Sequence, residues 1–330
     1  MPTTPVSTAP APRTAYVPSE LVHKQQADEV LLTGWRRTAP DAFTVTASWP
    51  TDHSFYAVRH TLHDPLLLTE TIRQIFPLLS HAAYDVPFGH HLLWETYDYA
   101  LIRDALHAEH VPALLDLHVT CLEEVRRGSR VTALTLRIDA VRGGLPLASA
   151  RTRFTIQSPA IYRRLRAGHG ERPLAPALPL PSPVPPSRVG RLSCRDVVLS
   201  PTQASDQWQL RVDNRHSILF DHPLDHVPGM LLLEAARQAA QGMCPQQPMV
   251  AVAMENRFFR YVEFDAPCWV KARPLADDAQ GRTRVDVVMR QNGTEHYAVT
   301  VTLEPAPAPR TALRYERCRP LHGVALSAHH

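Results

Sequence analysis

The sequence has few cysteines and few glycines, and these shortages exclude several classes of site. Its five cysteines are far apart and form no C-x-x-C pair, which argues against a zinc module and, in a chain of 330 residues, against a disulfide scaffold. Only thirteen residues are glycine, and there is no G-x-S-x-G elbow, Walker loop or G-x-G-x-x-G motif. We therefore expect no cofactor, and a bound phosphate would have to be held by arginine.

The sequence also lacks long apolar runs and a concentrated basic segment. No stretch reaches the roughly 18 to 20 apolar residues of a membrane span, and the N-terminus does not resemble a signal peptide. The net charge is +3, and the 33 arginines and two lysines are dispersed, so nucleic-acid binding is not indicated. The histidines lack the H-E-x-x-H register of a metal site. These features predict a cytoplasmic globular protein with no membrane, nucleic-acid or metal partner.

Proline is abundant, with 31 residues, and its distribution divides the chain. Seven of the fourteen residues from Pro173 to Pro186 are proline, which favours an extended spacer between two folded units. Both ends of the chain have a similar Pro/Ala character, which is typical of terminal arms. The predicted division is an N-terminal arm over 1–18, a first domain over 19–166, a linker over 167–190, a second domain over 191–304 and a tail over 305–330.

The two predicted domains are similar to one another near their centres. A shift of 164 residues places Asp64 to Gln74 on Pro228 to Gln238, with five identities in eleven positions. Three identities are polar residues in the order E-x-x-R-Q, which hydrophobic patterning alone would not produce. The matched residues are Leu67, Leu68, Glu70, Arg73 and Gln74 in the first domain, and Leu231, Leu232, Glu234, Arg237 and Gln238 in the second.

Each repeat predicts a buried helix followed by antiparallel strands. The segments after Pro65 and Pro228 are apolar on nearly every face, as in a helix enclosed by other structure. Downstream, β-branched and aromatic residues alternate with period two between turn signals such as Asn292-Gly293. The predicted fold class is α+β, with a curved antiparallel sheet wrapped around a central helix, occurring twice. Because one such sheet leaves an exposed edge, we expect an internal pseudo-dimer, which is compatible with a monomeric protein.

Glu234 and Arg237 are the first candidates for chemistry. They are three residues apart on the predicted helix, so they share one face, and Glu70 and Arg73 repeat this geometry. Each pair could act on a substrate, or it could be a structural ion pair that anchors a neighbouring loop. The repeat does not decide between these interpretations, because duplication preserves structural features too.

Histidines form a second set of candidates, because they lie just upstream of both helices. His60 and His63 precede the first helix, and His222 and His226 precede the second. A histidine there can approach a substrate held over the helix N-terminus, where free N–H groups and the helix dipole favour a developing negative charge. The alternative is that each is a surface residue bonded to a neighbouring aspartate.

The run HPLDHVPGMLLLEAARQA resembles the central-helix motif of hot-dog enzymes that act on acyl thioesters. Together with ELVHKQQADEVLLTGWRR near the start and the tandem repeat, it makes the chain resemble the A-factor biosynthesis family of γ-butyrolactone autoinducer synthases, over roughly residues 20–165 and 190–304. The resemblance implies a tandem hot-dog protein from an actinomycete. Such an enzyme transfers a β-ketoacyl group from acyl carrier protein to the hydroxyl of dihydroxyacetone phosphate, and the ester then cyclises to a butenolide.

The resemblance also suggests roles for individual residues. The dehydratase-type helix carboxylate falls on Glu234, with Glu70 as its counterpart, and we expect a buried glutamate to act on the substrate hydroxyl. Arg237 and Arg73 are then candidates for binding phosphate or stabilising an anionic intermediate. The remaining candidates are His222 for catalysis, His226 and His60 for substrate binding, and the backbone N–H groups near Gly229 for the oxyanion.

The sequence departs from the dehydratases upstream of the second helix. Phe220 occupies the position of their catalytic histidine, and His222 lies two residues later, which favours acyl transfer over dehydration. Two alternatives remain: a hot-dog thioester hydrolase or dehydratase, and a non-enzymatic lactone-binding regulator. A regulator would need a DNA-binding module, and the sequence has no helix-turn-helix preceding a basic face.

Overall fold

The computed structural model describes residues 17–166 and 179–308. Most of the predicted N-terminal arm, residues 167–178 of the predicted linker and the tail from residue 309 onward lie outside these described residues. Within the described ranges, no helix is long and apolar enough to cross a membrane.

Two long helices occupy the positions predicted from the repeat. Helix α1 spans Pro65–Tyr84 and helix α3 spans Gly229–Gly242. At the start of α1, proline is tolerated because its missing N–H would have no partner in the first turn, and the preceding Asp64 caps the helix through its carboxylate. Most residues of both helices are buried, so each helix lies inside the fold. A short helix, α2, spans Pro159–Leu165.

The strands of the described residues form one antiparallel sheet, in the order β1-β2-β4-β5-β6-β3-β9-β12-β11-β10-β8-β7. Alternating burial along strands such as β4 agrees with the predicted period of two. The strands are β1 (Leu32–Ala39), β2 (Ala42–Trp49), β3 (His91–Leu101), β4 (Ala113–Arg127), β5 (Arg130–Arg142), β6 (Leu145–Gln157), β7 (Leu199–Pro201), β8 (Gln207–Leu210), β9 (Met249–Phe258), β10 (Cys268–Leu275), β11 (Thr283–Gln291) and β12 (Thr294–Pro305). Residues 17–166 and 179–308 also contain five short 3₁₀ helices, namely η1 (Ser19–Val22), η2 (Ala27–Glu29), η3 (Arg103–Leu106), η4 (Pro186–Val189) and η5 (Cys194–Asp196).

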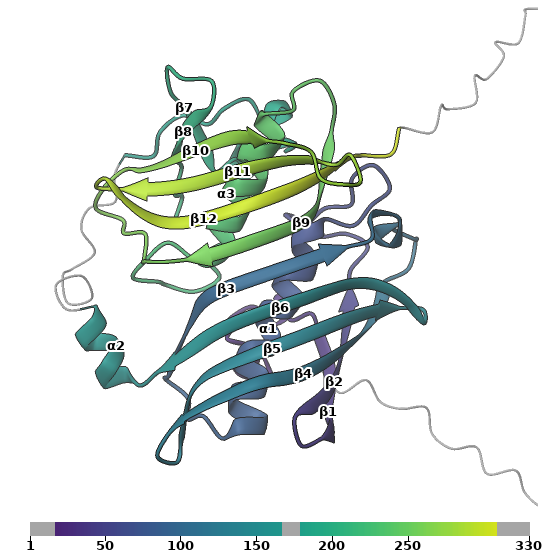
Figure 1. The fold of residues 1–330 in the computed structure, drawn as a ribbon, viewed down its shortest axis with the longest axis vertical. Coiled ribbons are helices and arrows are strands. Elements are labelled where there is room, and N and C mark those ends of the chain that lie inside the picture. The colour runs from purple at the N-terminus through teal and green to yellow at the C-terminus, as the bar shows by residue number, and fades with distance from the viewer. Residues whose placement is uncertain (1–16, 167–178, 309–330) are drawn as a thin grey trace, which may run out of the picture.

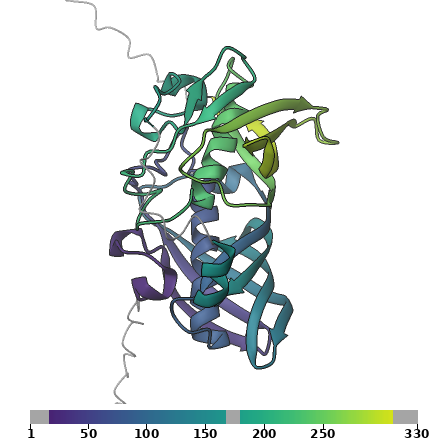
Figure 2. The ribbon, with the colours of Figure 1, turned by 90° about the vertical axis from the view of Figure 1, so that its left-hand side faces the viewer.

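The two halves of the sheet join through β3 and β9. These strands pair from Thr96 opposite Arg257 to Ala100 opposite Ala253. Figure 1 shows the sheet with α1 and α3 behind it, and Figure 2, after a quarter turn, shows both helices on the same side of the sheet. Each half alone would leave one of these edges unpaired. The predicted α+β class, the repeated helix-in-sheet unit and the internal pseudo-dimer are confirmed.

The C-terminal part of the predicted linker is folded against the second unit. Val184 and Val189 are buried, and the Val184 N–H donates to the Leu199 carbonyl at 3.0 Å. Helix η4 lies against α3. The boundary predicted at residue 190 therefore falls within packed structure, because proline content reports backbone stiffness and not the burial of the apolar residues between the prolines.

Candidate active site

Glu70 lies on α1 at the centre of the Glu70 cluster, which consists of Glu70, Arg73, Gln74 and Lys24. Its carboxylate accepts hydrogen bonds from Arg73 Nη2 at 2.8 Å and Gln74 Nε2 at 3.0 Å. Lys24 Nζ lies 3.1 Å from Glu70 Oε1. Arg73 and Gln74 reach the carboxylate because they follow it by three and four residues on the helix. Glu70 is only 2% exposed, so two cations surround one buried anion.

Glu234 has an equivalent place on α3 in the Glu234 cluster, which consists of Glu234, Arg237, Gln238 and Arg191. Arg191 Nε and Arg237 Nη2 donate to Glu234 Oε1 at 2.7 and 2.6 Å, and Arg237 Nε donates to Oε2 at 2.9 Å. Gln238 Nε2 donates to Glu234 Oε1 as well. Glu234 is 0% exposed. Three of these bonds go to Oε1 and one goes to Oε2, so the protein holds both oxygens of this carboxylate.

The glutamines give the clusters a common scaffold. Gln74 ties α1 to the chain just before β1, accepting from the Leu31 N–H at 2.9 Å and donating to the Glu29 carbonyl at 2.8 Å. Gln238 ties α3 to the chain just before β7 through the same two kinds of bond. The E-x-x-R-Q pattern is thus explained in both units: the glutamine fixes a neighbouring segment, and the glutamate holds cations.

Lys24 and Arg191 are site residues that the sequence analysis did not identify as candidates. Each follows a residue with a left-handed backbone at the end of a short 3₁₀ helix, namely His23 (φ 52°) and Gly190 (φ 70°). Lys24 and Arg191 are 167 residues apart, whereas the two helices are offset by 164 residues. The offset that aligns the helices therefore does not align Lys24 with Arg191. A second comparison at 167 places V-H-K on V-G-R and would have found them.

Both glutamates are ionised at neutral pH. Burial alone would raise the pKa of Glu234, but the charges and hydrogen bonds of Arg191 and Arg237 outweigh it and lower the pKa to about 2. Burial likewise opposes the stronger effect of Arg73 and Lys24, which hold the pKa of Glu70 well below its ordinary value. Such carboxylates are weak bases. The geometry therefore argues against the proton-accepting role expected of the glutamates and favours a role in positioning cations.

His222 belongs to the second unit but lies beside the Glu70 cluster of the first. Burial and the charge of Arg73 lower the pKa of His222, although Asp221, 3.7 Å away, partly opposes them. Asp221 also fastens this loop to the first unit, since its carboxylate accepts a hydrogen bond from the Gln25 N–H at 2.7 Å. The His222 side chain is 35% exposed. It is neutral at pH 7 and accessible, so it can accept a proton.

His226 and His60 have other surroundings. His226 Nδ1 lies 2.7 Å from the Asp225 carboxylate, which also accepts hydrogen bonds from the Tyr162 hydroxyl at 2.8 Å and Arg166 Nε at 3.1 Å. His60 is exposed and has a positive φ of 50° in a tight turn. Among the described residues, neither histidine forms a hydrogen bond with either cluster. Their substrate-binding roles stay predictions.

His63 is buried and has an unusual environment. Neither of its ring nitrogens has a hydrogen-bond partner among residues 17–166 and 179–308, and its ring meets Trp49 edge-on, with centroids 5.4 Å apart. Burial lowers the pKa of His63 to about 4, so it is a neutral side chain of the first unit's interior.

Gly229 begins α3 in contact with aromatic rings of β3 and β9. A Cβ at this position would meet Trp94 Cε3 at 2.9 Å and Phe258 Cε1 at 3.6 Å. Glycine thus lets the helix N-terminus approach the junction between the units. No side chain of the described residues caps this N-terminus, whereas Asp64 caps that of α1. The first N–H groups of α3 are therefore better suited to an oxyanion than those of α1.

We expect Gly229→Ala to lower the free energy of unfolding by about 1 to 3 kcal/mol, because the added methyl overlaps the Trp94 ring. Urea unfolding measures this loss. In a Trp94→Leu background the same substitution should cost clearly less. An equal loss in both backgrounds would show that the indole is not the obstacle.

The described residues suit anions better than metal ions. They contain no group of three or more His, Cys, Asp or Glu side chains that could hold a metal. The basic side chains around Glu70 and Glu234 instead offer guanidinium and ammonium donors, which match phosphate and carboxylate groups.

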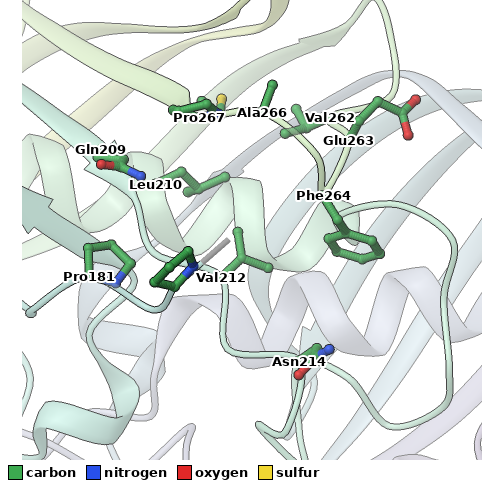
Figure 3. Close-up of a pocket in the computed structure, with 12 residues that line it drawn as sticks. Pro181, Gln209, Leu210, Val212, Asn214, Val262, Glu263, Phe264, Ala266 and Pro267 are labelled. Carbon is green, nitrogen blue, oxygen red and sulfur yellow. The ribbon is translucent and has the colours of Figure 1, made fainter. Parts of the chain in front are cut away.

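An apolar pocket lies in the second unit, and its lining connects to the His222 loop. Leu210, Val212 and Phe264 contribute to its wall, and Figure 3 shows these side chains around it. The Phe264 ring contacts the ring of Phe220, with centroids 6.1 Å apart. Phe220 lies two residues before His222 in the sequence. The lining also includes Gln209, Asn214 and Glu263, and the volume of about 40 Å³ is too small for a long hydrocarbon chain.

Comparison with known proteins gives consistent matches. The sequence model of AfsA, the A-factor biosynthesis hotdog domain, matches residues 6–158 and 174–306. The chain is 43% identical over 289 residues to a 2-oxo-3-(phosphooxy)propyl 3-oxoalkanoate synthase of Streptomyces virginiae, which covers 87% of this chain and 97% of the relative. It is 42% identical over 289 residues to a synthase of the same name from Streptomyces coelicolor (strain ATCC BAA-471 / A3(2) / M145), covering 87% and 91%.

Solved structures show the same fold. A crystal structure of a putative oleoyl thioesterase from Lactobacillus plantarum superposes with a TM-score of 0.50. Its sequence identity is 14%, and the match covers 81% of this chain and 97% of the other. At this identity the likeness concerns the fold alone.

Proposed function

This chain belongs to the A-factor biosynthesis hotdog family, and from that premise we propose that it is an acyltransferase that moves a β-ketoacyl group from a thioester to the hydroxyl of dihydroxyacetone phosphate. The observation that carries the proposal is 43% identity over nearly the whole of a synthase named for this ester. A 2-oxo-3-(phosphooxy)propyl 3-oxoalkanoate consists of a triose phosphate joined to a β-keto acid. This would be the first step towards a γ-butyrolactone or butenolide signal.

The reaction requires a base, an oxyanion site and a leaving thiol. The hydroxyl oxygen attacks the thioester carbonyl carbon, the tetrahedral intermediate collapses, the C–S bond breaks, and the hydroxyl proton passes to the thiol. We assign the proton transfer to His222, because it is neutral and partly exposed beside Arg73. The N–H groups at the start of α3, near Gly229, are our candidates for the oxyanion.

The buried glutamates hold the cations in place in this proposal. Glu70 fixes Arg73 beside His222, where a guanidinium can stabilise the developing negative charge. Glu234 fixes Arg237, which is a candidate for binding the substrate phosphate. No covalent acyl-enzyme is required.

The donor and the setting are further parts of the proposal. We propose acyl carrier protein as the carrier of the β-ketoacyl chain, and a cytoplasmic enzyme that needs no cofactor. Because one chain supplies both halves of the sheet, the enzyme can work as a monomer with an internal pseudo-dimer.

The test is to incubate the protein with a β-ketoacyl thioester, with and without dihydroxyacetone phosphate, and to identify products by mass spectrometry. We expect the phosphorylated ester to form only when the triose phosphate is present, and faster from acyl carrier protein than from free pantetheine. Hydrolysis that is indifferent to the triose would favour a thioester hydrolase instead. Loss of water from a β-hydroxyacyl thioester would favour a dehydratase, and a mobility shift of promoter DNA would favour a regulator.

A further inference from the structure

Arg59 is a residue of the first unit that reaches the Glu234 cluster of the second. Its Nη1 donates to the carbonyl of Gly190, the residue before Arg191. Its backbone is fixed by a tight turn, in which the Arg59 N–H donates to the Leu62 carbonyl at 2.9 Å. The turn thus presents the guanidinium across the boundary between the two units.

The repeat places Arg59 where the other cluster has His222. In the first unit, His53 Nδ1 accepts hydrogen bonds from two backbone N–H groups, two and three residues further on. His216 Nδ1 does the same in the second unit. Arg59 and His222 each follow these histidines by six residues. The two clusters therefore receive different side chains from the opposite unit, a guanidinium in one and an imidazole in the other.

This difference leaves the Glu234 cluster with unbalanced charge. Arg59, Arg191 and Arg237 contribute three positive charges, while the nearby carboxylates are Glu234 and Asp64, the latter 3.7 Å from Arg191 Nη1. Burial and the two neighbouring guanidiniums lower the pKa of Arg59 from its ordinary value, as expected where like charges are crowded.

The Glu70 cluster is balanced by comparison. Lys24 and Arg73 face the carboxylates of Glu70 and Asp221, and His222 is neutral. An additional dianion would thus be attracted to the Glu234 cluster more strongly than to the Glu70 cluster.

Arg191 provides an independent observation that points to an anion site. It is 4% exposed, its Nε donates to Glu234 and its Nη1 to the Phe55 carbonyl at 2.6 Å, and its guanidinium lies 4.0 Å from the centroid of the Phe55 ring. Its Nη2 is buried and has no hydrogen-bond partner among the residues that the structure describes. A buried charged donor left unpaired is costly, and an oxyanion placed there would satisfy it.

We propose that Arg59, Arg191 and Arg237 together bind the phosphate of the triose phosphate substrate. The identity of the ligand rests on the proposed function. The site itself rests on the unpaired Nη2 of Arg191 and on the excess positive charge of the Glu234 cluster. Guanidinium groups from two sides suit a phosphate monoester, which has several oxygens to receive them.

Tyr56 connects this site with the proton acceptor. Burial and the carboxylates of Glu70, Asp64 and Glu234 raise the pKa of Tyr56, so the phenol lies within electrostatic reach of both clusters. Tyr56 is 2% exposed, so this phenol is a buried group near both clusters. The two clusters would serve one reaction, one binding the phosphate and one moving the proton.

Calorimetric titration with dihydroxyacetone phosphate, inorganic phosphate and unphosphorylated dihydroxyacetone tests the proposal without any acyl donor. We expect Arg59→Ala to weaken binding of both phosphate compounds about 10- to 100-fold, and Arg59→Lys, which keeps the charge, to weaken it less. Arg137→Ala is the matched control, because this 61% exposed arginine pairs only with Asp139 on β5 in the described chain. It should bind like the wild type.

Several results would overturn the proposal. The first is unchanged phosphate binding in Arg59→Ala, and the second is an equal loss of phosphate affinity in Arg59→Ala and Arg137→Ala. The third is displacement of inorganic phosphate by 4′-phosphopantetheine but not by the triose phosphate, which would assign the site to the phosphopantetheine of acyl carrier protein. Failure of the transferase assignment is distinguishable, since it would leave phosphate binding and its dependence on Arg59 intact while no ester forms.

Discussion

We expect the His222→Ala protein to transfer acyl groups about 10²- to 10⁴-fold more slowly than the wild type while keeping its thermal stability. The reason is that His222 is neutral and partly exposed beside Arg73, whereas the glutamates of both clusters are ionised weak bases held by cations. Single-turnover kinetics with a β-ketoacyl thioester and dihydroxyacetone phosphate would measure the chemical step.

The pH profile separates proton transfer from a structural role of His222. The imidazole accepts a proton only in its neutral form, and its pKa is lowered from the ordinary value, so the wild-type rate should rise with pH below neutrality and level off by pH 7. This acid limb should be absent in His222→Ala. His118→Ala is a matched control, since His118 is exposed on β4 and belongs to neither cluster. Equal rates in the wild type and His222→Ala would refute the assignment.

The second large effect concerns stability. Glu234→Ala should lower the free energy of unfolding by about 3 to 5 kcal/mol, because it leaves the buried guanidiniums of Arg191 and Arg237 without their common anion. Asp139→Ala is the control, as it removes the carboxylate of an exposed pair with Arg137 and should cost less than about 1 kcal/mol. Chemical denaturation measures both. A loss below about 1 kcal/mol in Glu234→Ala would mean that the cluster contributes little to folding.

Acid denaturation tests the same contact in another way. The pKa of Glu234 is about 2 in the folded protein and near 4.5 when unperturbed, so its ionised form stabilises the fold above pH 4.5 and this contribution is lost as the pH falls towards 2. Glu234→Gln removes the titrating group, and its stability should depend less on pH in this window. An unchanged slope would show that other carboxylates account for the acid sensitivity.

The helices and one half of each cluster were predictable from sequence, because their residues are neighbours on a helix. Glu234 and Arg237, and Glu70 and Arg73, are three residues apart, and the repeat draws attention to them. The other half was not predictable at a single offset. Arg191 lies 43 residues before Glu234, in a segment whose repeat spacing differs by three residues from that of the helices.

Contacts between the units were the hardest to foresee. His222 lies in sequence beside α3, which suggested that it serves the helix it precedes, yet it lies beside Arg73 of α1. Arg59 crosses in the opposite direction to Gly190. Periodicity and motif spacing report local structure, whereas these contacts follow from how the two halves meet along β3 and β9.

Several strands also escaped the pattern analysis, for physical reasons. β7 and β8 have three and four residues, which is too short to show an alternation. β3 has an irregularity in its pairing with β6 between Trp94 and Thr96, and such a bulge shifts the alternation of side chains by one position. β1 has similar irregularities in its pairing with β2.

The joining of both halves in one polypeptide has a consequence for inheritance. In a dimer of identical subunits, a substitution that introduces histidine at one of two symmetric positions introduces it at the other as well. Here the two halves are different parts of one sequence, so a change at one position leaves the equivalent position unaltered. Arg59 and His222 could therefore arise independently at equivalent positions. Two halves within one chain can therefore take different roles, which strict twofold symmetry between identical subunits forbids.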